Sequence, residues 1–271
     1  MNKNKYIIFS GFIFFSVLTF GQGNCNLYEG KCKESCELAN EAGKGQGSRK
    51  SQELFDKCIE LCPTYAYAYF EKSVPYLKQG QFKEWKELID KAVMYDPSYL
   101  LNRGCNQIQF IRNYEQGVQD LDSLVSLRKT IEIGFSPSGE YHAQMLRAIS
   151  YQKLGDVDKA IELCEELVNS NNYNQSPFDY FHIGIIHLEA GNFNKAERAL
   201  VKQNKYDEKA ENYFYLSKVF EQKGEFSKQR ELLEKSKEVY LEGKIMTTNY
   251  YHYIDKIFLT DIESELLKLN K

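Results

Sequence analysis

The sequence predicts an all-α protein that repeats one unit of two helices along the chain. Residues 66–97 show this unit most completely, because large side chains at Tyr69 and Tyr76 mark one helix face at a period of about 3.6 residues. Gly80 interrupts the period, which then resumes until Pro97 ends it. The same arrangement returns in later segments, and repetition of this kind indicates an elongated array of helices.

The units on either side of this one are less regular. Counting back from Pro63 places a unit at residues 32–63, with a short polar first helix and a clearly amphipathic second helix. A third unit is predicted at residues 98–126. Its Gly104 stands where the repeat expects a small residue, and a second small residue, Gly117, comes one position late.

A turn-rich insertion near residues 130–140 divides the array, since residues 134–139 read Gly-Phe-Ser-Pro-Ser-Gly. Three more units follow the insertion, and each places its small and large residues at the repeat spacing. They cover residues 141–171, 178–207 and 210–241. In the first of them, Asp156 and Asp158 can cap the second helix.

The last element is predicted to be a single amphipathic helix over residues 248–269. Its apolar positions fall at i, i+4, i+7, i+8 and i+12, and they are Tyr250, Ile254, Ile257, Phe258 and Ile262. Because the final unit of an array leaves an apolar face uncovered, we expect this helix to cap it.

The amino terminus has the features of a secretory signal. Lys3 and Lys5 precede an apolar run over residues 6–20 without an acidic side chain, and a cleavage site is expected just before Gln22. An uncleaved amino-terminal anchor is the alternative. The predicted divisions are a signal peptide at 1–21, a flexible segment at 22–31, the repeat array at 32–247 and a capping helix at 248–271.

The charge of the chain excludes one class of partner. Without the signal, the chain has 33 basic and 38 acidic side chains and a net charge of −5. We expect no nucleic acid as a partner, because the main electrostatic term of such binding needs a basic surface. We expect an exported protein, periplasmic or secreted, with no membrane span after signal cleavage.

The spacing of aromatic and small residues resembles the tetratricopeptide repeat (TPR), a helix-turn-helix unit of about 34 residues. The matching positions are the early aromatic (Tyr69, Tyr180, Tyr213), the small residue of the first helix (Ser73, Ala148, Gly184, Ser217), its large partner (Tyr76, Tyr151, His187, Phe220) and the small residue of the second helix (Ala160, Ala196). Trp85 and Gln229 depart from that last position. The resemblance implies a right-handed all-α solenoid of about six TPR-like repeats, with a concave face built from the first helices.

Seven cysteines behind an export signal indicate disulfide chemistry. Cys32 and Cys36 share one helix face, and Cys58 and Cys62 share a face of the next helix. An antiparallel hairpin can therefore bring Cys36 opposite Cys58 and bring the outer two cysteines together, as a Cys32–Cys62 pair. This spacing resembles the laced hairpins of the small Tim chaperones, over these four residues only and without implying chaperone activity. Zinc on the four thiolates is the alternative.

The other polar or reactive groups have ordinary structural explanations. Residues 43–48 are rich in glycine but lack the spacing of a phosphate-binding loop, so we expect a turn between helices. His182 and His187 lie five apart and point to different helix faces, which disfavours a shared metal. No nucleophile, base and orienter stand at a known catalytic spacing, so we expect no enzyme, no cofactor and no metal. Cys105 and Cys164 are expected to pack as small apolar groups, and Cys25 is expected to pair outside the domain or to remain free.

The functional expectation rests on the first-helix positions that face away from the second helices. These positions are apolar, and they are Tyr67, Phe70, Val74, Leu77, Met145, Ile149, Phe178, Phe181, Ile185, Leu188 and Phe214. An exposed apolar face needs a partner, so we expect a cell-envelope scaffold that binds a peptide or helix of another protein in this groove. The same residues would also be explained by packing against neighbouring repeats or a folded-back carboxy-terminal helix. A binding protein for an apolar small molecule is the second hypothesis, and a closed pocket would distinguish it.

Overall fold

The computed structural model describes residues 24–270, which contain thirteen α-helices and no β-strand. The all-α prediction is confirmed. By their contacts, the described residues divide into two units at the boundary between Tyr65 and Ala66. The predicted signal peptide at 1–21 and its cleavage site lie outside the described residues.

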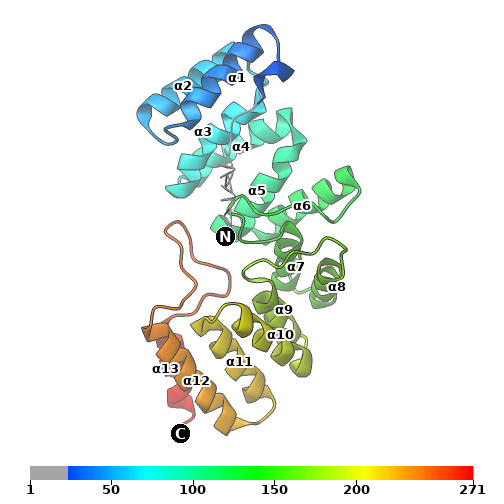
Figure 1. The fold of residues 1–271 in the computed structure, drawn as a ribbon, viewed down its shortest axis with the longest axis vertical. Coiled ribbons are helices and arrows are strands. Elements are labelled where there is room, and N and C mark those ends of the chain that lie inside the picture. The colour runs from blue at the N-terminus through cyan, green and yellow to red at the C-terminus, as the bar shows by residue number, and fades with distance from the viewer. Residues whose placement is uncertain (1–23, 271) are drawn as a thin grey trace, which may run out of the picture. The chain divides into compact units, whose positions relative to one another are not determined.

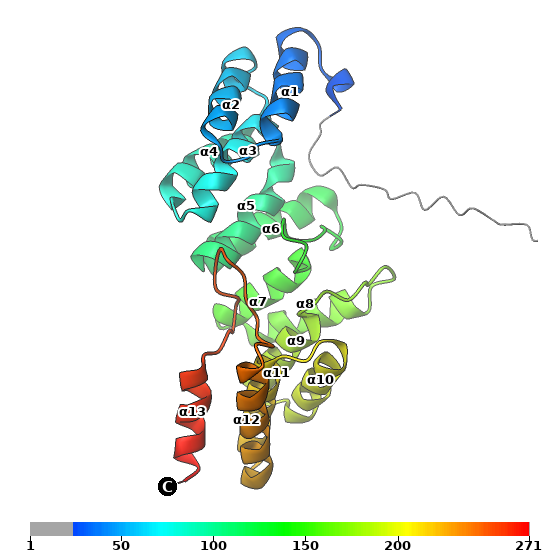
Figure 2. The ribbon, with the colours of Figure 1, turned by 60° about the vertical axis from the view of Figure 1, so that its left-hand side comes forward.

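The amino-terminal unit is a pair of helices, α1 (Gly30–Gly43) and α2 (Arg49–Leu61), preceded by a short 3₁₀ turn at Cys25–Leu27 (Figure 2). Ser48 begins α2, because its side-chain oxygen accepts a hydrogen bond from the N–H of Ser51 at 3.2 Å. The glycine-rich residues before this cap therefore form a turn between helices.

Two disulfides cross-link the amino-terminal unit. Cys32 is bonded to Cys62, the pairing that the sequence predicts, with 4.9 Å between the Cα atoms. The predicted Cys36–Cys58 bond is wrong, because Cys36 is bonded to Cys25. Cys58 is instead a buried free thiol.

The unexpected pairing has a local cause in the segment that the sequence predicts to be flexible. The Asn24 side chain caps the 3₁₀ turn, and the ring of Tyr28 packs edge-on against Tyr65 with 5.2 Å between centroids. The side-chain amide of Asn40 also donates to the sulfur of Cys25 at 3.3 Å. These contacts hold the segment in place from residue 24 onward. Cys25 therefore lies close enough to Cys36 of α1 to form a disulfide.

The carboxy-terminal unit contains five helix pairs and a final single helix (Figure 1). Each pair coincides with one segment that the sequence assigns to a repeat, although the second pair ends at Arg128, two residues past the predicted end of its unit. The pairs are α3 (Ala66–Lys78) with α4 (Phe82–Tyr95), α5 (Leu100–Asn106) with α6 (Tyr114–Arg128), α7 (Ala143–Lys153) with α8 (Val157–Val168), α9 (Asp179–Glu189) with α10 (Phe193–Tyr206), and α11 (Ala210–Gln222) with α12 (Phe226–Leu241). The final helix is α13 (Leu259–Lys268).

The turns inside these pairs are set by local sequence. Gly80 and Gly191 each follow a first helix with φ angles of 74° and 73°, in the left-handed region where a side chain is strained. Asp156 caps α8 as predicted, since its carboxylate accepts the N–H of Lys159 at 3.0 Å. Helix ends are therefore fixed within a few residues of each turn.

The pair of α5 and α6 is held close by two glycines. A Cβ atom at Gly117 would lie only 2.4 Å from Cγ1 of Ile108 and 3.0 Å from the carbonyl oxygen of Gly104. Beyond the glycine contact, α5 passes into a π-helical turn, Gln107–Ile111, and Arg112 ends it with a φ of 61°. This turn carries side chains to the candidate site described below.

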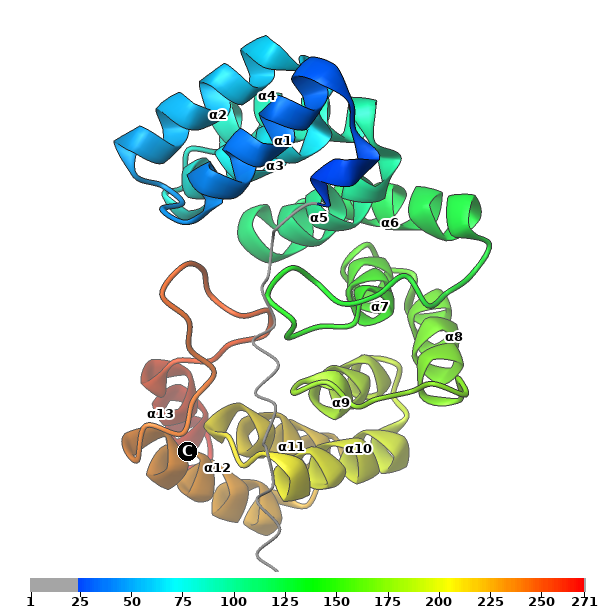
Figure 3. The ribbon, with the colours of Figure 1, turned by 45° about the horizontal axis from the view of Figure 1, so that its top comes forward.

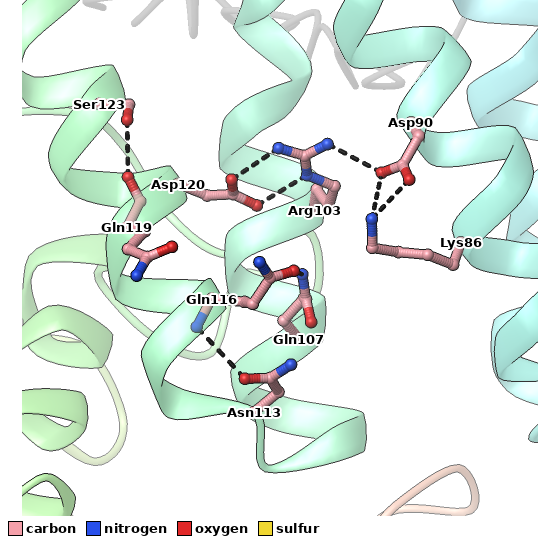
Figure 4. A network of polar contacts seen from close by, with 9 residues as sticks. All are labelled: Lys86, Asp90, Arg103, Gln107, Asn113, Gln116, Gln119, Asp120 and Ser123. Atoms are coloured by element: carbon pink, nitrogen blue, oxygen red, sulfur yellow. Dashed lines mark hydrogen bonds and ion pairs between the residues drawn. The ribbon is translucent and has the colours of Figure 1, made fainter.

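Ion pairs connect successive helix pairs. Arg103 of α5 donates hydrogen bonds to both carboxylate oxygens of Asp120 of α6, at 2.8 and 2.7 Å (Figure 4). It donates a third to Asp90 of α4 at 2.8 Å, and Asp90 also accepts from Lys86 at 2.6 Å. The fork of the guanidinium thus fixes the alignment of three helices.

The segment before α13 differs from the prediction. Residues 244–258, here called the strap, contain neither helix nor strand. The final helix begins only at Leu259. The Asp261 carboxylate caps its start by accepting a hydrogen bond from the N–H of Phe258 at 2.7 Å. The predicted helix over 248–269 is therefore wrong for its first half. Its apolar period is satisfied in another way, because the strap packs beside the first helices α7, α9 and α11 (Figure 3).

Candidate functional site

The apolar positions that were expected to form an open groove are mostly covered. Those that are buried are Leu77, Met145, Ile149, Phe178, Phe181, Ile185 and Phe214. Those that keep partial exposure are Tyr67, Phe70, Val74 and Leu188. The Phe178 ring packs against Tyr253 of the strap at 5.0 Å, and the Phe181 ring against Tyr215 of α11 at 5.4 Å. The expected exposed apolar face is therefore wrong at the seven buried positions, whereas the other four keep part of their surface exposed.

The strap lies beside the first helices and the turn before α7 (Figure 3). It makes polar and aromatic contacts with them. These contacts join residues up to 142 positions apart in the chain. The residues that receive the strap are called the inner face, and they are Gln109, Phe110, Arg112, Glu140, Lys153, Phe178, His182 and Glu211.

Tyr251 and Tyr253 are the main side-chain anchors of the strap. Their hydroxyls donate hydrogen bonds to the two carboxylate oxygens of Glu140, at 2.8 Å from Tyr251. The side-chain amide of Gln109 donates to the Tyr251 hydroxyl at 2.9 Å. Burial and then Glu140 raise the pKa of both tyrosines, so their hydroxyls stay protonated and donate.

The inner face also holds the backbone of the strap. Arg112 donates a hydrogen bond from Nη2 to the carbonyl oxygen of His252. Its Nη1 donates hydrogen bonds to the carbonyl oxygens of Ile108 and Gln109, at 3.1 and 2.7 Å. The guanidinium is therefore held in place by the π-helical turn that precedes it. The His252 side chain is exposed, and this contact therefore places no demand on its identity.

Asp255 lies between a lysine and a histidine. Its Oδ1 is 2.7 Å from Nζ of Lys153, and its Oδ2 is 3.3 Å from Nδ1 of the fully buried His182, without hydrogen-bond alignment. Burial alone raises the pKa of Asp255, but His182 and Lys153 outweigh burial and lower this pKa to about 2. The carboxylate is therefore ionised at neutral pH and paired with Lys153.

Both ends of the strap are attached to the last helices. The N–H of Ala210 donates to the carbonyl of Lys244 at 3.0 Å, and the N–H of Met246 donates to the Glu211 carboxylate at 3.0 Å. At the other end, Ile257 is buried in an apolar cluster shared by α11, α12 and α13. The strap is therefore a loop tied down at both ends.

Sequence reasoning missed the strap and its polar partners. One compositional signal was present, because residues 247–249 are Thr-Thr-Asn, three weak helix formers, and Tyr250, Tyr251 and Tyr253 follow closely. Asp255 also has a φ of 59°, which a helix does not accommodate. The composition could have argued against a helix, but it could not have named the residues of the inner face.

Other groups that the sequence singled out lie apart from the inner face. His187 lines a cavity of about 270 Å³ with Tyr180, Lys195 and Arg198, whereas His182 faces the strap, so the two histidines do point to different sides. A second cavity, of about 150 Å³, lies beside the 131–135 segment and Tyr173. Across residues 24–270, no group of three or more His, Cys, Asp or Glu side chains is placed to hold a metal ion.

Helices of the described part are too short or too polar to cross a bilayer. Cys105 and Cys164 are buried free thiols, as the sequence suggests for small packed groups. Burial raises the pKa of both thiols, so they remain protonated.

Comparison with protein-family models identifies two of the helix pairs. Models of the tetratricopeptide repeat match residues 66–99, which hold α3 and α4, and residues 142–171, which hold α7 and α8. No curated protein sequence matches the chain.

Solved structures share the fold at low identity. PilW, described as a widely conserved type IV pilus biogenesis factor, has a TM-score of 0.60 at 14% identity, covering 79% of this chain and 96% of that one. PilF of Pseudomonas aeruginosa has a TM-score of 0.59 at 15% identity, covering 86% and 99%. A tetratricopeptide repeat protein from Parabacteroides merdae has a TM-score of 0.52 at 15% identity, covering 87% and 83%. At identities this low, the similarity shows a shared fold and nothing further.

Proposed function

The chain belongs to the tetratricopeptide-repeat family, and from this we propose that it is a non-catalytic scaffold whose inner face binds a segment of another protein. The strap is the observation that carries the proposal. A stretch of irregular chain is held there by two tyrosine hydroxyls, one backbone carbonyl and one ion pair. A partner segment of similar chemistry can use the same contacts.

The proposal includes a location outside the cytoplasm, in the cell envelope or beyond it. Two disulfides in the amino-terminal unit favour an oxidising compartment, and the predicted signal peptide agrees with export. The similarity to PilW and PilF supports a scaffold fold, and from those proteins we take no partner for this one.

Neither of the two cavities described above favours an apolar small molecule as the ligand. The two cavities described above measure about 150 and 270 Å³. Pockets for drug-sized ligands usually span about 300 to 1,000 Å³ and are largely enclosed. The inner face instead receives a length of polypeptide across several helices, which favours a peptide as the natural ligand.

Site-specific photo-cross-linking tests this proposal in extracts of the native cells. A photoreactive residue at Glu189 is suitable, because this side chain is exposed on α9 and acts electrostatically on Lys153 and Tyr215, beside the strap. The matched control is Val201, which is exposed on the second helix α10. We expect a discrete protein adduct from position 189 and none from position 201. Adducts of equal yield at both positions, or at position 201 alone, would count against the proposal.

A further inference from the structure

We propose that the inner face recognises a tyrosine-x-tyrosine-apolar-aspartate segment of its partner, and that strap residues 251–255 occupy the site as a tethered competitor. The inference rests on the proposed function and adds the chemistry of the partner segment to it. Three sets of contacts support this inference, one for each position at which the inner face requires a particular side chain: Tyr251, Tyr253 and Asp255.

The first two demands come from Glu140. Its two carboxylate oxygens each accept one hydroxyl, from Tyr251 and from Tyr253, whose rings lie 5.5 Å apart. Phenylalanine at either position would keep the ring packing against Phe110 or Phe178. It would, however, leave one acceptor of a partly buried carboxylate without its donor, which is costly. The inner face therefore selects aromatic rings that carry a hydroxyl.

The third demand comes from Lys153 and His182. These groups converge on Asp255, whose side chain keeps only 9% of its surface exposed. A neutral residue at this position would leave the half-buried Lys153 charge without its close partner. Ile254, just before it, is buried, so an apolar residue belongs there.

The position between the tyrosines is free. His252 is exposed and is held through its carbonyl oxygen by Arg112, a contact that any residue can offer. Main-chain hydrogen bonds to the strap are few among the described residues. Besides the bond from Arg112, the N–H of Met246 donates to Glu211, and the carbonyl of Lys244 accepts from the N–H of Ala210. Displacing the strap therefore breaks few main-chain hydrogen bonds.

Tethering explains why a partner must compete. A segment joined to the protein at both ends has an effective concentration on the order of millimolar at its own site. A free peptide of the same sequence therefore meets a face that is mostly closed, and its apparent affinity falls by the fraction that is open. Removing the anchors of the strap should raise peptide affinity without altering the inner face.

The test uses a fluorescent synthetic peptide with the sequence of residues 248–258, TNYYHYIDKIF, and the full chain. The opened variant carries Tyr251→Ala and Tyr253→Ala, and the matched control carries Tyr250→Ala, at a tyrosine that is 53% exposed. Fluorescence anisotropy should show at least tenfold tighter peptide binding by the opened variant than by the wild type or the control. A peptide with phenylalanine at both anchor positions should bind the opened variant at least tenfold more weakly.

A second measurement covers the case in which the opened variant does not fold. Hydrogen exchange of the wild-type chain should show faster exchange in the strap amides when the unlabelled peptide is in large excess. Unchanged strap exchange, equal binding by the opened variant and the wild type, or equal binding of the tyrosine and phenylalanine peptides would overturn the inference. If position 189 still cross-links a partner in that event, the scaffold function stands and only the recognition motif falls.

Discussion

The ion pair that anchors the strap gives a pH-dependent prediction for Asp255→Asn. Asparagine keeps the shape of the side chain and tolerates the left-handed φ of 59°, so the change removes mainly the charge. A carboxyl pKa of about 2 in the folded chain, against the ordinary 3.8, corresponds to about 2 kcal/mol of folding stability at neutral pH. Because the pKa is lowered on folding, this stability is complete above about pH 4 and is lost as the pH falls towards 2.

Urea denaturation of the wild type and of Asp255→Asn between pH 7 and pH 2.5 measures this contribution. The free energies of unfolding should differ by about 2 kcal/mol at pH 7, and the difference should shrink steadily below about pH 4. Glu87→Gln is the control, because Glu87 is exposed on α4 and should contribute less than about 0.5 kcal/mol at any pH. A difference that is absent at pH 7, or that stays constant with pH, would refute the assignment of Lys153 and His182 as the cause.

Three further outcomes are expected. Gly117→Ala should destabilise the chain by about 1 to 3 kcal/mol in thermal melts, since the new methyl group would overlap Ile108, and an unchanged melting temperature would contradict that packing. Arg103→Met should cost about 2 kcal/mol in urea, because the mostly buried carboxylate of Asp120 loses its partner, and a neutral effect would mean that the network contributes nothing. Peptide mapping without reduction should find one free thiol in the amino-terminal unit, at Cys58, and a disulfide at that residue would refute the pairing.

The array was predictable because its signals are local. A glycine such as Gly191 needs only its own φ angle to end a helix, and a cap such as Asp156 needs only the next three residues. The same period that places large side chains on one face also places them in the core between paired helices. These determinants lie within one turn of each boundary, and a single sequence contains all of them.

The candidate site was not predictable from those signals. Ile254 and Ile257 fall at helical spacing, yet each is buried by contact with distant helices and not by a helix of its own. The charge pair of Asp255 joins residues 102 positions apart, and no local pattern marks Lys153 as its partner. An amphipathic period indicates which side chains are buried. It does not determine whether the segment that carries them is a helix or an irregular loop.

The disulfides illustrate the same limit on a smaller scale. Helical spacing of four identified Cys32 and Cys62 as partners, because Cys32 lies in α1 and Cys62 directly follows the facing helix α2. For Cys36 the helical spacing predicted Cys58 as the partner. The 3₁₀ turn instead places Cys25 at bonding distance from Cys36. Spacing within helices could not reveal Cys25 as an alternative disulfide partner, because Cys25 lies outside the two helices.

The buried thiol of Cys58 also controls how long this covalent arrangement lasts. Burial raises its pKa to about 11, from an ordinary value of 9.0. At pH 7 roughly one such thiol in ten thousand is ionised, compared with about one in a hundred at the ordinary pKa. Exchange between thiols and disulfides proceeds through the thiolate, so the smaller thiolate population slows rearrangement to the Cys36–Cys58 isomer. The buried, protonated thiol of Cys58 thus gives the two disulfides of the hairpin kinetic protection against exchange.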